Sequence, residues 1–210
     1  MIPLSRQILP RSQLLTMYHL LTILTLFLLM IISSSTSFAG YSHGRNAYLK
    51  GDYSTALKEW IPAAEEGSVY AQYSLGIMYG NGQGTPQDYK AAFKWCTLAA
   101  EQGHAGAQYN LGIMYAIGQG VPQDYKAAFK WYTLSAEQHN ANAQNNLGAM
   151  YAQGVGVPQN YFRAYMYFYM STVNKSEAGA ENRRKLSRKL TSAQIEKAQI
   201  QAIIEIKICC

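Results

Sequence analysis

Cysteine and histidine are the side chains here most suited to nucleophilic or metal chemistry, but their spacing supports neither. His43, His104 and His139 do not fall at intervals such as H-x-x-x-H, which would place two imidazoles on one helix face as metal ligands. Cys96 lies on the apolar stripe of a predicted helix and is interpreted as a small core residue. The spacing therefore predicts no metal site and no thiol nucleophile.

Carboxylates and glycine-rich segments recur at a fixed interval, which argues against catalysis. Asp88 and Glu101 return 36 positions later as Asp124 and Glu137, whereas an active site is usually a single constellation. Capping and solvation of helices explain them better. The segment 80–84 (GNGQG) lacks the Gly-Lys-Ser/Thr of a phosphate-binding loop and does not follow a strand. We predict no catalytic or cofactor-binding residue, no cofactor, and a protein that is not an enzyme.

Internal repetition is the strongest signal in the sequence. Residues 71–106 and 107–142 are identical at 27 of 36 aligned positions without a gap. A third copy starts at Ala143 and then decays, and residues 51–57 resemble the second half of the unit. Such a period is typical of stacked supersecondary units.

Each unit is predicted to form two helices. In the first, Ala71, Leu75 and Met78 share one face. Glycines at 82 and 84 end that helix, and Asp88 is the expected N-cap of the second.

Glycine also recurs inside the first helix of each unit, at Gly76, Gly112 and Gly148. A mid-helix glycine costs about 1 kcal/mol relative to alanine. A close helix–helix approach that leaves no room for a Cβ would offset this cost, so tight packing is expected.

The C-terminal region is predicted to cap the stack. Residues 178–190 form a polar helix, and residues 191–194 (TSAQ) form a capping box that starts a final helix from 192 to about 206. The expected buried stripe of that helix is Ile195, Ala198, Gln199 and Ile203.

The repeated pattern A-x-x-x-L-G-x-M-Y-x-x-G-x-G-V-P-Q-D-Y-x-x-A resembles the Sel1-like repeat, a relative of the tetratricopeptide repeat, over roughly residues 45–175. The resemblance implies an all-α, right-handed α/α superhelical solenoid of about three 36-residue repeats. The expected boundaries are 40–177 for the solenoid and 178–210 for the capping helices and tail. The implied function is a scaffold or adaptor for a partner protein or peptide.

When this repeat is aligned with the tetratricopeptide repeat, the positions that line the binding groove of the latter form a candidate partner-binding set on the concave face. The set is Tyr70, Tyr73, Ile77, Asn81, Tyr109, Ile113, Ile117, Asn142, Asn145 and Gln153. Tyrosine offers rigid aromatic area and asparagine adaptable hydrogen bonding. The alternative is that the tyrosines and isoleucines at 73, 77, 109 and 113 only pack between neighbouring helices.

One branch of the family pairs cysteines within each unit and has been associated with β-lactamase activity. This sequence departs from that branch, because Cys96 is the only cysteine in the repeats and no S-x-x-K motif is present. An enzyme acting on the cell wall or β-lactams remains the alternative function, together with a membrane-tethered regulator of envelope signalling.

Residues 1–39 have the features of a signal peptide. Arg6 and Arg11 precede an apolar run over 20–32, and Ser37 and Ala39 suit cleavage before Gly40. The expected location is periplasmic or secreted, with translation starting at Met1 or Met17. The alternative is an uncleaved inner-membrane anchor over 14–32, long enough to span a bilayer.

Charge is concentrated at the ends of the chain. Residues 40–173 are neutral and residues 174–210 carry a net +4, so the repeats lack the basic face of a nucleic-acid binder. The basic run 183–189 is interpreted as a solvated helix face, with contact to an anionic surface as the alternative. Cys209 and Cys210 could link two chains through a disulfide, or form an unstructured tail.

Overall fold

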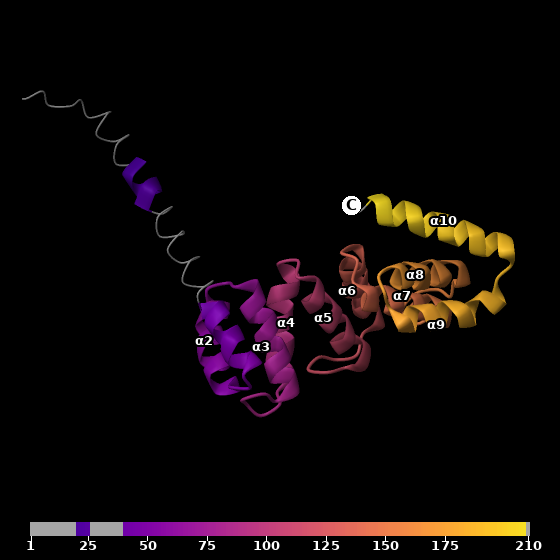
Figure 1. Ribbon diagram of the computed structural model, residues 1–210. Coiled ribbons are helices and arrows are strands. Elements are labelled where there is room, and N and C mark those ends of the chain that lie inside the picture. Colours follow the sequence, from indigo (N-terminus) through magenta and orange to yellow (C-terminus); the bar gives the residue numbers. More distant parts are fainter. Residues whose placement is uncertain (1–19, 26–39, 209–210) are drawn as a thin grey trace, which may run out of the picture.

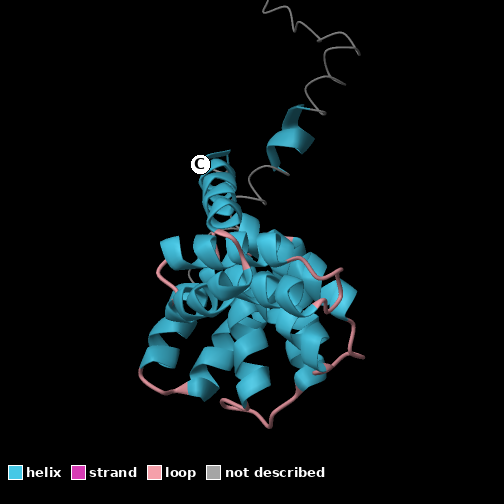
Figure 2. Cartoon of the chain, turned by 90° about the vertical axis from the view of Figure 1, so that its right-hand side faces the viewer, coloured by secondary structure: helices cyan, strands magenta, loops and turns pink. Residues whose placement is uncertain are grey.

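The computed structural model describes residues 20–25 and 40–208, and every regular element in these ranges is helical (Figure 2). Residues 20–25 and 40–49 are helical. The elements that follow are α2 (Tyr53–Glu65), α3 (Val69–Asn81), α4 (Tyr89–Glu101), α5 (Ala105–Ile117), α6 (Tyr125–Glu137), α7 (Ala141–Gln153), α8 (Tyr161–Val173), α9 (Glu177–Leu186), the 3-10 turn η1 (Ser187–Lys189) and α10 (Ser192–Ile208). The predicted all-α fold is confirmed.

The helices stack in consecutive pairs along the chain (Figure 1). Within each repeat a first helix packs on a second, as α3 on α4, α5 on α6 and α7 on α8. Each second helix also packs on the first helix of the next repeat. The resulting array is the predicted solenoid of helix pairs, and the helix over 40–49 followed by α2 precedes the first full repeat.

The helix ends follow the predicted capping residues. The carboxylate of Asp88 accepts hydrogen bonds from the backbone N–H groups of Lys90 at 2.9 Å and Ala91 at 3.0 Å. Gly82 closes the first helix in the left-handed conformation, with φ 67°. These local signals fix where each helix starts and stops.

The glycines inside the first helices lie where two helices approach closely, as expected. A Cβ built on Gly76 would lie 2.5 Å from Sγ of Cys96. On Gly112 it would lie 2.5 Å from the ring of Tyr132, and on Gly148 2.6 Å from the ring of Phe168. Successive second helices therefore place a cysteine, a tyrosine and a phenylalanine against the same glycine position.

A buried glutamine joins each repeat to the one before it. The side-chain amide of Gln108 donates to the backbone oxygen of Ala100 in the preceding helix at 3.2 Å, and its oxygen accepts from Gln138 at 2.8 Å. Gln72 and Gln144 make the same pair of contacts in their own repeats. Because each amide is nearly inaccessible to solvent, these bonds satisfy polar groups that would otherwise be costly to bury.

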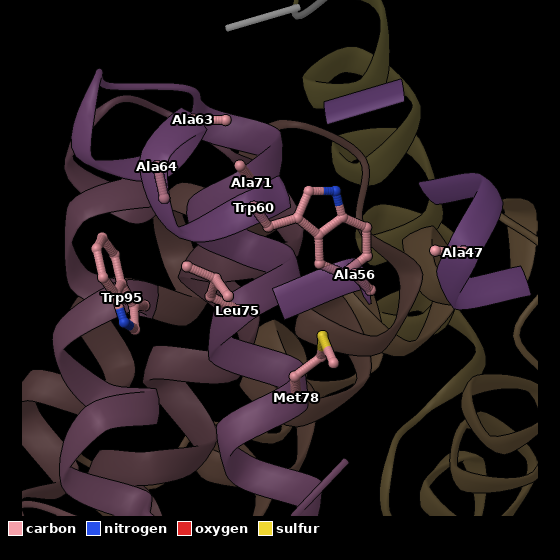
Figure 3. Close-up of a cluster of buried hydrophobic side chains, with 9 residues drawn as sticks. All are labelled: Ala47, Ala56, Trp60, Ala63, Ala64, Ala71, Leu75, Met78 and Trp95. Carbon is pink, nitrogen blue, oxygen red and sulfur yellow. The ribbon is translucent and has the colours of Figure 1, made fainter. Parts of the chain in front are cut away.

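Alanine, leucine, methionine and aromatic side chains form the core between the two helix layers. Figure 3 shows its N-terminal part, where Leu75 and Met78 of α3 lie near Trp60 of α2 and Ala47 of the preceding helix. The equivalent leucines of the next repeats, Leu111 and Leu147, are also fully buried. The core is therefore repeated with the sequence unit.

The final helix confirms the predicted capping box but not the whole predicted stripe. The backbone N–H of Thr191 donates to the side chain of Gln194 at 2.9 Å, and the N–H of Gln194 donates back to the Thr191 hydroxyl at 3.3 Å. Ala198 and Ala202 are fully buried against α8, whereas Ile203 is 41% exposed. The buried stripe thus passes through residue 202 and not through residue 203.

None of the helices in the described ranges combines the length and apolar character required to cross a bilayer. Of the predicted signal segment 1–39, only residues 20–25 are described, and the proposed cleavage site lies outside the description. Cys209 and Cys210, the predicted cross-linking residues, also lie outside it.

Candidate partner-binding surface

The first helices of successive repeats form one face of the stack, here called the first-helix face and defined by α3, α5, α7 and α9. Helices α3, α5 and α7 contain no Asp, Glu, Lys or Arg. The second helices α4, α6 and α8 carry the repeat lysines, the arginine and the glutamates instead. Over three repeats this face therefore presents aromatic, aliphatic and amide side chains without formal charge.

A groove of about 380 Å³ runs between α3 and α5, with α4 as its floor. Four of the predicted binding residues line it: Tyr73, Ile77, Asn81 and Ile113. Their side chains are half-buried, except that of Asn81, which is exposed. The groove thus combines an apolar floor with amide groups at its rim, a combination suited to binding a chain of neutral residues.

The remaining predicted residues are dispersed. Tyr70 is 60% exposed, and its ring lies 5.5 Å from that of Tyr41 and 5.7 Å from that of His104. Ile117 is 57% exposed, and Asn142 is also exposed. These positions are accessible but lie outside the α3–α5 groove.

Two predicted residues make contacts inside the protein. Tyr109 is half-buried, with its ring 6.0 Å from that of Tyr132. Asn145 accepts a hydrogen bond at 2.9 Å from Asn182 of α9. Gln153 is exposed and lines a second groove, between α7 and α9. The predicted set thus includes both residues that pack inside the protein and residues that are accessible on its surface.

Burial favours the uncharged forms of Cys96 and Tyr73 in the α3–α5 groove and of His104 beside it. Desolvation raises the pKa of Cys96 to about 12, so its thiol is a poor nucleophile there. Desolvation also raises the pKa of Tyr73, with a smaller contribution from Cys96. Burial lowers the pKa of His104, whose ring lies 4.3 Å from that of Tyr73. No ionised group is therefore generated on the floor of this groove.

Sequence reasoning missed several residues of the same face. Asn110 and Gln119 line the α3–α5 groove. Tyr41, Arg45 and Leu49 line a neighbouring groove of about 200 Å³ that shares Ile77 with the first. Asn110 could have been found by counting 36 positions on from Ser74, which lines that neighbouring groove. The turn after the helix over 40–49 is shorter than the turns inside the repeats. Counting back 36 positions from the first repeat therefore does not lead to the equivalent residues of this helix.

The chemistry available on this surface is recognition. Among the described residues, no group of three or more His, Cys, Asp or Glu side chains is arranged to hold a metal ion. Tyrosine rings, isoleucines and amides can bury apolar side chains and pair with peptide groups. Over α3, α5 and α7 the surface therefore suits contact with uncharged side chains and peptide groups.

Comparison with known proteins identifies the repeat. A sequence model described as the Sel1 repeat matches residues 69–104, 105–140 and 141–172, which are the three helix pairs of the structure. A search of curated proteins found no match.

Two solved structures share this architecture. A Sel1 repeat protein from Oxalobacter formigenes is 29% identical, with a TM-score of 0.64 over 67% of this chain and 58% of that one. A protective antigen present in uropathogenic Escherichia coli strains, displaying an SLR fold, is 27% identical, with a TM-score of 0.58 over 83% of this chain and 45% of that one. The present chain spans only about half the length of these structures.

Proposed function

This chain belongs to the Sel1 repeat family, and from that premise we propose that it is an exported, non-enzymatic scaffold that binds a partner protein or peptide through its first-helix face. The Sel1-repeat solenoid generally serves as a protein-binding scaffold. The single observation that carries the proposal is the uncharged α3–α5 groove, whose lining includes Ile77 and Ile113. Accessible apolar surface of this kind is typical of interaction sites.

The signal-peptide features of residues 1–39 support export. On this proposal, the partner is in the periplasm or outside the cell. A partner segment would bury apolar side chains against the two isoleucines and pair its peptide groups with Asn81 and Asn110. Each such hydrogen bond adds about 0.5–1.5 kcal/mol, so affinity would come from several contacts together.

The test is affinity capture from an envelope extract with a pair of matched variants. Replacing Ile77 and Ile113 by Gln changes the groove from apolar to polar at two half-buried positions. Replacing Val173 and Ile200 by Gln makes the same change at exposed positions away from the groove. We expect the same protein to be recovered with the wild type and the control variant but lost with the groove variant.

Circular dichroism of the three proteins checks that both variants keep their helical content. Equal recovery of that protein with the groove variant would show that binding occurs elsewhere on the solenoid. If no protein is recovered above background by any of the three, the scaffold proposal fails.

A further inference from the structure

The groove between α7 and α9 is the structural equivalent of the groove between α3 and α5, two repeats further along. It has a volume of about 250 Å³. Most of its lining residues stand 72 positions, or two repeats, after residues that line the first groove. They are Ala149, Ala152, Gln153, Phe168, Asn182, Lys185 and Leu186. The same site is therefore built twice on the first-helix face.

The equivalence arises because α9 takes the place of the first helix of a fourth repeat. It packs on α8 as α5 packs on α4, and it also contacts α7. A side-chain hydrogen bond joins this unit to the third repeat, since Asn182 of α9 donates to Asn145 of α7 at 2.9 Å. Ser176 caps α9 at the position where Asn140 caps α7.

The chemistry of the two grooves differs in charge. The position held by Ile77 and Ile113 in the first two repeats, and by Ala149 in the third, is held by Lys185 in α9. Similarly, Lys189 occupies the position of Ile117. The first-helix face is thus uncharged over α3, α5 and α7 and cationic at its α9 end.

Both ammonium groups retain binding capacity. Nζ of Lys185 lies 2.6 Å from a carboxylate oxygen of Glu181, but both side chains are more than half exposed, and exposed pairs of this kind contribute little. Nζ of Lys189 donates to the hydroxyl of Tyr161 at 3.2 Å. Each ammonium carries three donors, so an incoming carboxylate can be bound alongside these partners. The side chains of Gln153 and Asn182 line the same groove and add amide donors.

We infer that the partner is an extended peptide segment with acidic side chains at one end and apolar side chains at the other. The Asp or Glu side chains bind at Lys185 and Lys189, and the apolar side chains bind between Ile77 and Ile113. The axes of two helices come no closer than about 8–10 Å, so two repeat steps span about 20 Å or more. An extended chain covers that distance in about six residues or more. This inference rests on the proposed function. It predicts which side chains the partner carries and that its acidic end lies at α9.

The probe is a random peptide library of about twelve residues per peptide, displayed through its C-termini so that no free terminal carboxylate is present. The purified full chain is the bait. We expect selected peptides to contain Asp or Glu near one end and apolar residues about six or more positions away. Fusion through the C-terminus means that any acidic preference comes from side chains.

The matched variants change two lysines each. Replacing Lys185 and Lys189 by Gln is expected to abolish the acidic preference and to lower the affinity for a selected peptide about tenfold or more, as for loss of two charge-assisted contacts. The control variant replaces Lys90 and Lys126, exposed lysines of the second helices, by Gln and so removes the same net charge. We expect this variant to keep the preference for acidic peptides.

Three results would overturn the inference. Selected peptides that are apolar but not acidic would leave the scaffold function standing while removing its acidic partner. An acidic preference that survives in the Lys185→Gln/Lys189→Gln variant would place the cationic site elsewhere. A library from which nothing is enriched would count against both the partner and the peptide-binding function itself.

Discussion

His104 shows how one residue serves both the fold and the candidate surface. Its Nδ1 accepts a hydrogen bond from the backbone N–H of Ala107 at 3.1 Å, so it is the N-cap of α5. Ser68 and Asn140 fill the same role in α3 and α7. The sequence did not predict this capping role, because histidine is not among the preferred N-caps.

The capping bond makes stability depend on pH in a predictable direction. The cap requires a neutral ring, and burial lowers the pKa of His104 below its ordinary value of about 6.5. The unfolded chain therefore binds a proton more readily, so the free energy of unfolding falls as pH drops from about 7 towards the folded pKa. Replacing His104 by Asn should preserve the cap and reduce this dependence.

Urea unfolding between pH 5 and 8 measures the effect. The wild type should lose more stability over this range than the His104→Asn variant. Parallel pH profiles for the two proteins would mean that other groups cause the dependence.

At the scale of the element, each repeat is held together by contact between a glycine and a side chain of the facing helix. The sequence predicted a close contact at this glycine, because a glycine in the middle of a helix lowers stability relative to alanine unless tight packing offsets the loss. It did not predict that Cys96, Tyr132 and Phe168 provide the opposing side chain. These side chains stand at the same position of the 36-residue unit, but they differ so much in volume that only the packed structure identifies them as the contact of the glycine.

Two glycine-to-alanine substitutions separate packing from helix propensity. A Cβ on Gly112 would meet the Tyr132 ring at 2.5 Å, so Gly112→Ala should lower the free energy of unfolding by about 1–3 kcal/mol. A Cβ on Gly80, in α3, would find its nearest neighbour at 3.7 Å. Gly80→Ala should therefore raise stability by up to about 1 kcal/mol.

Chemical denaturation followed by circular dichroism provides both values. The comparison is informative because both glycines lie in first helices and both changes add one methyl group. A loss of stability in both variants would show that the first helices cannot accept alanine for a reason other than contact.

At the scale of the whole molecule, the array ends in a helix that departs from the repeat. Helix α10 packs on α8 through Ala198 and Ala202, and the side chain of Gln199 donates to the hydroxyl of Tyr165 at 3.3 Å. The sequence predicted this helix and its start from the capping box. It misassigned Ile203 to the buried face, because apolar residues stand at both 202 and 203 and the pattern alone does not decide which of the two faces α8.

Undocking α10 should loosen the end of the stack without affecting its beginning. Replacing Ala198 and Ala202 by Glu places charges in a buried contact, which is strongly unfavourable. We expect faster amide hydrogen exchange in α8 and α10 and unchanged exchange in α3 and α4, because each repeat contacts mainly its neighbours.

The control replaces Ile200 and Ile203 by Glu at exposed positions of the same helix. Exchange in α8 should then match the wild type. Equal effects of the two pairs would indicate that α10 is marginally docked and that charge anywhere on it releases it.

The near-identity of two repeats has a consequence for how the chain reaches this structure. Residues 71–106 and 107–142 offer almost the same docking surfaces, down to the glutamines at 72 and 108. During refolding, a helix pair can therefore dock one unit out of register, or exchange with its counterpart in another copy of the chain. The side chains at positions 96 and 132 differ in bulk, but both face a glycine, so this contact does not prevent the shifted pairing.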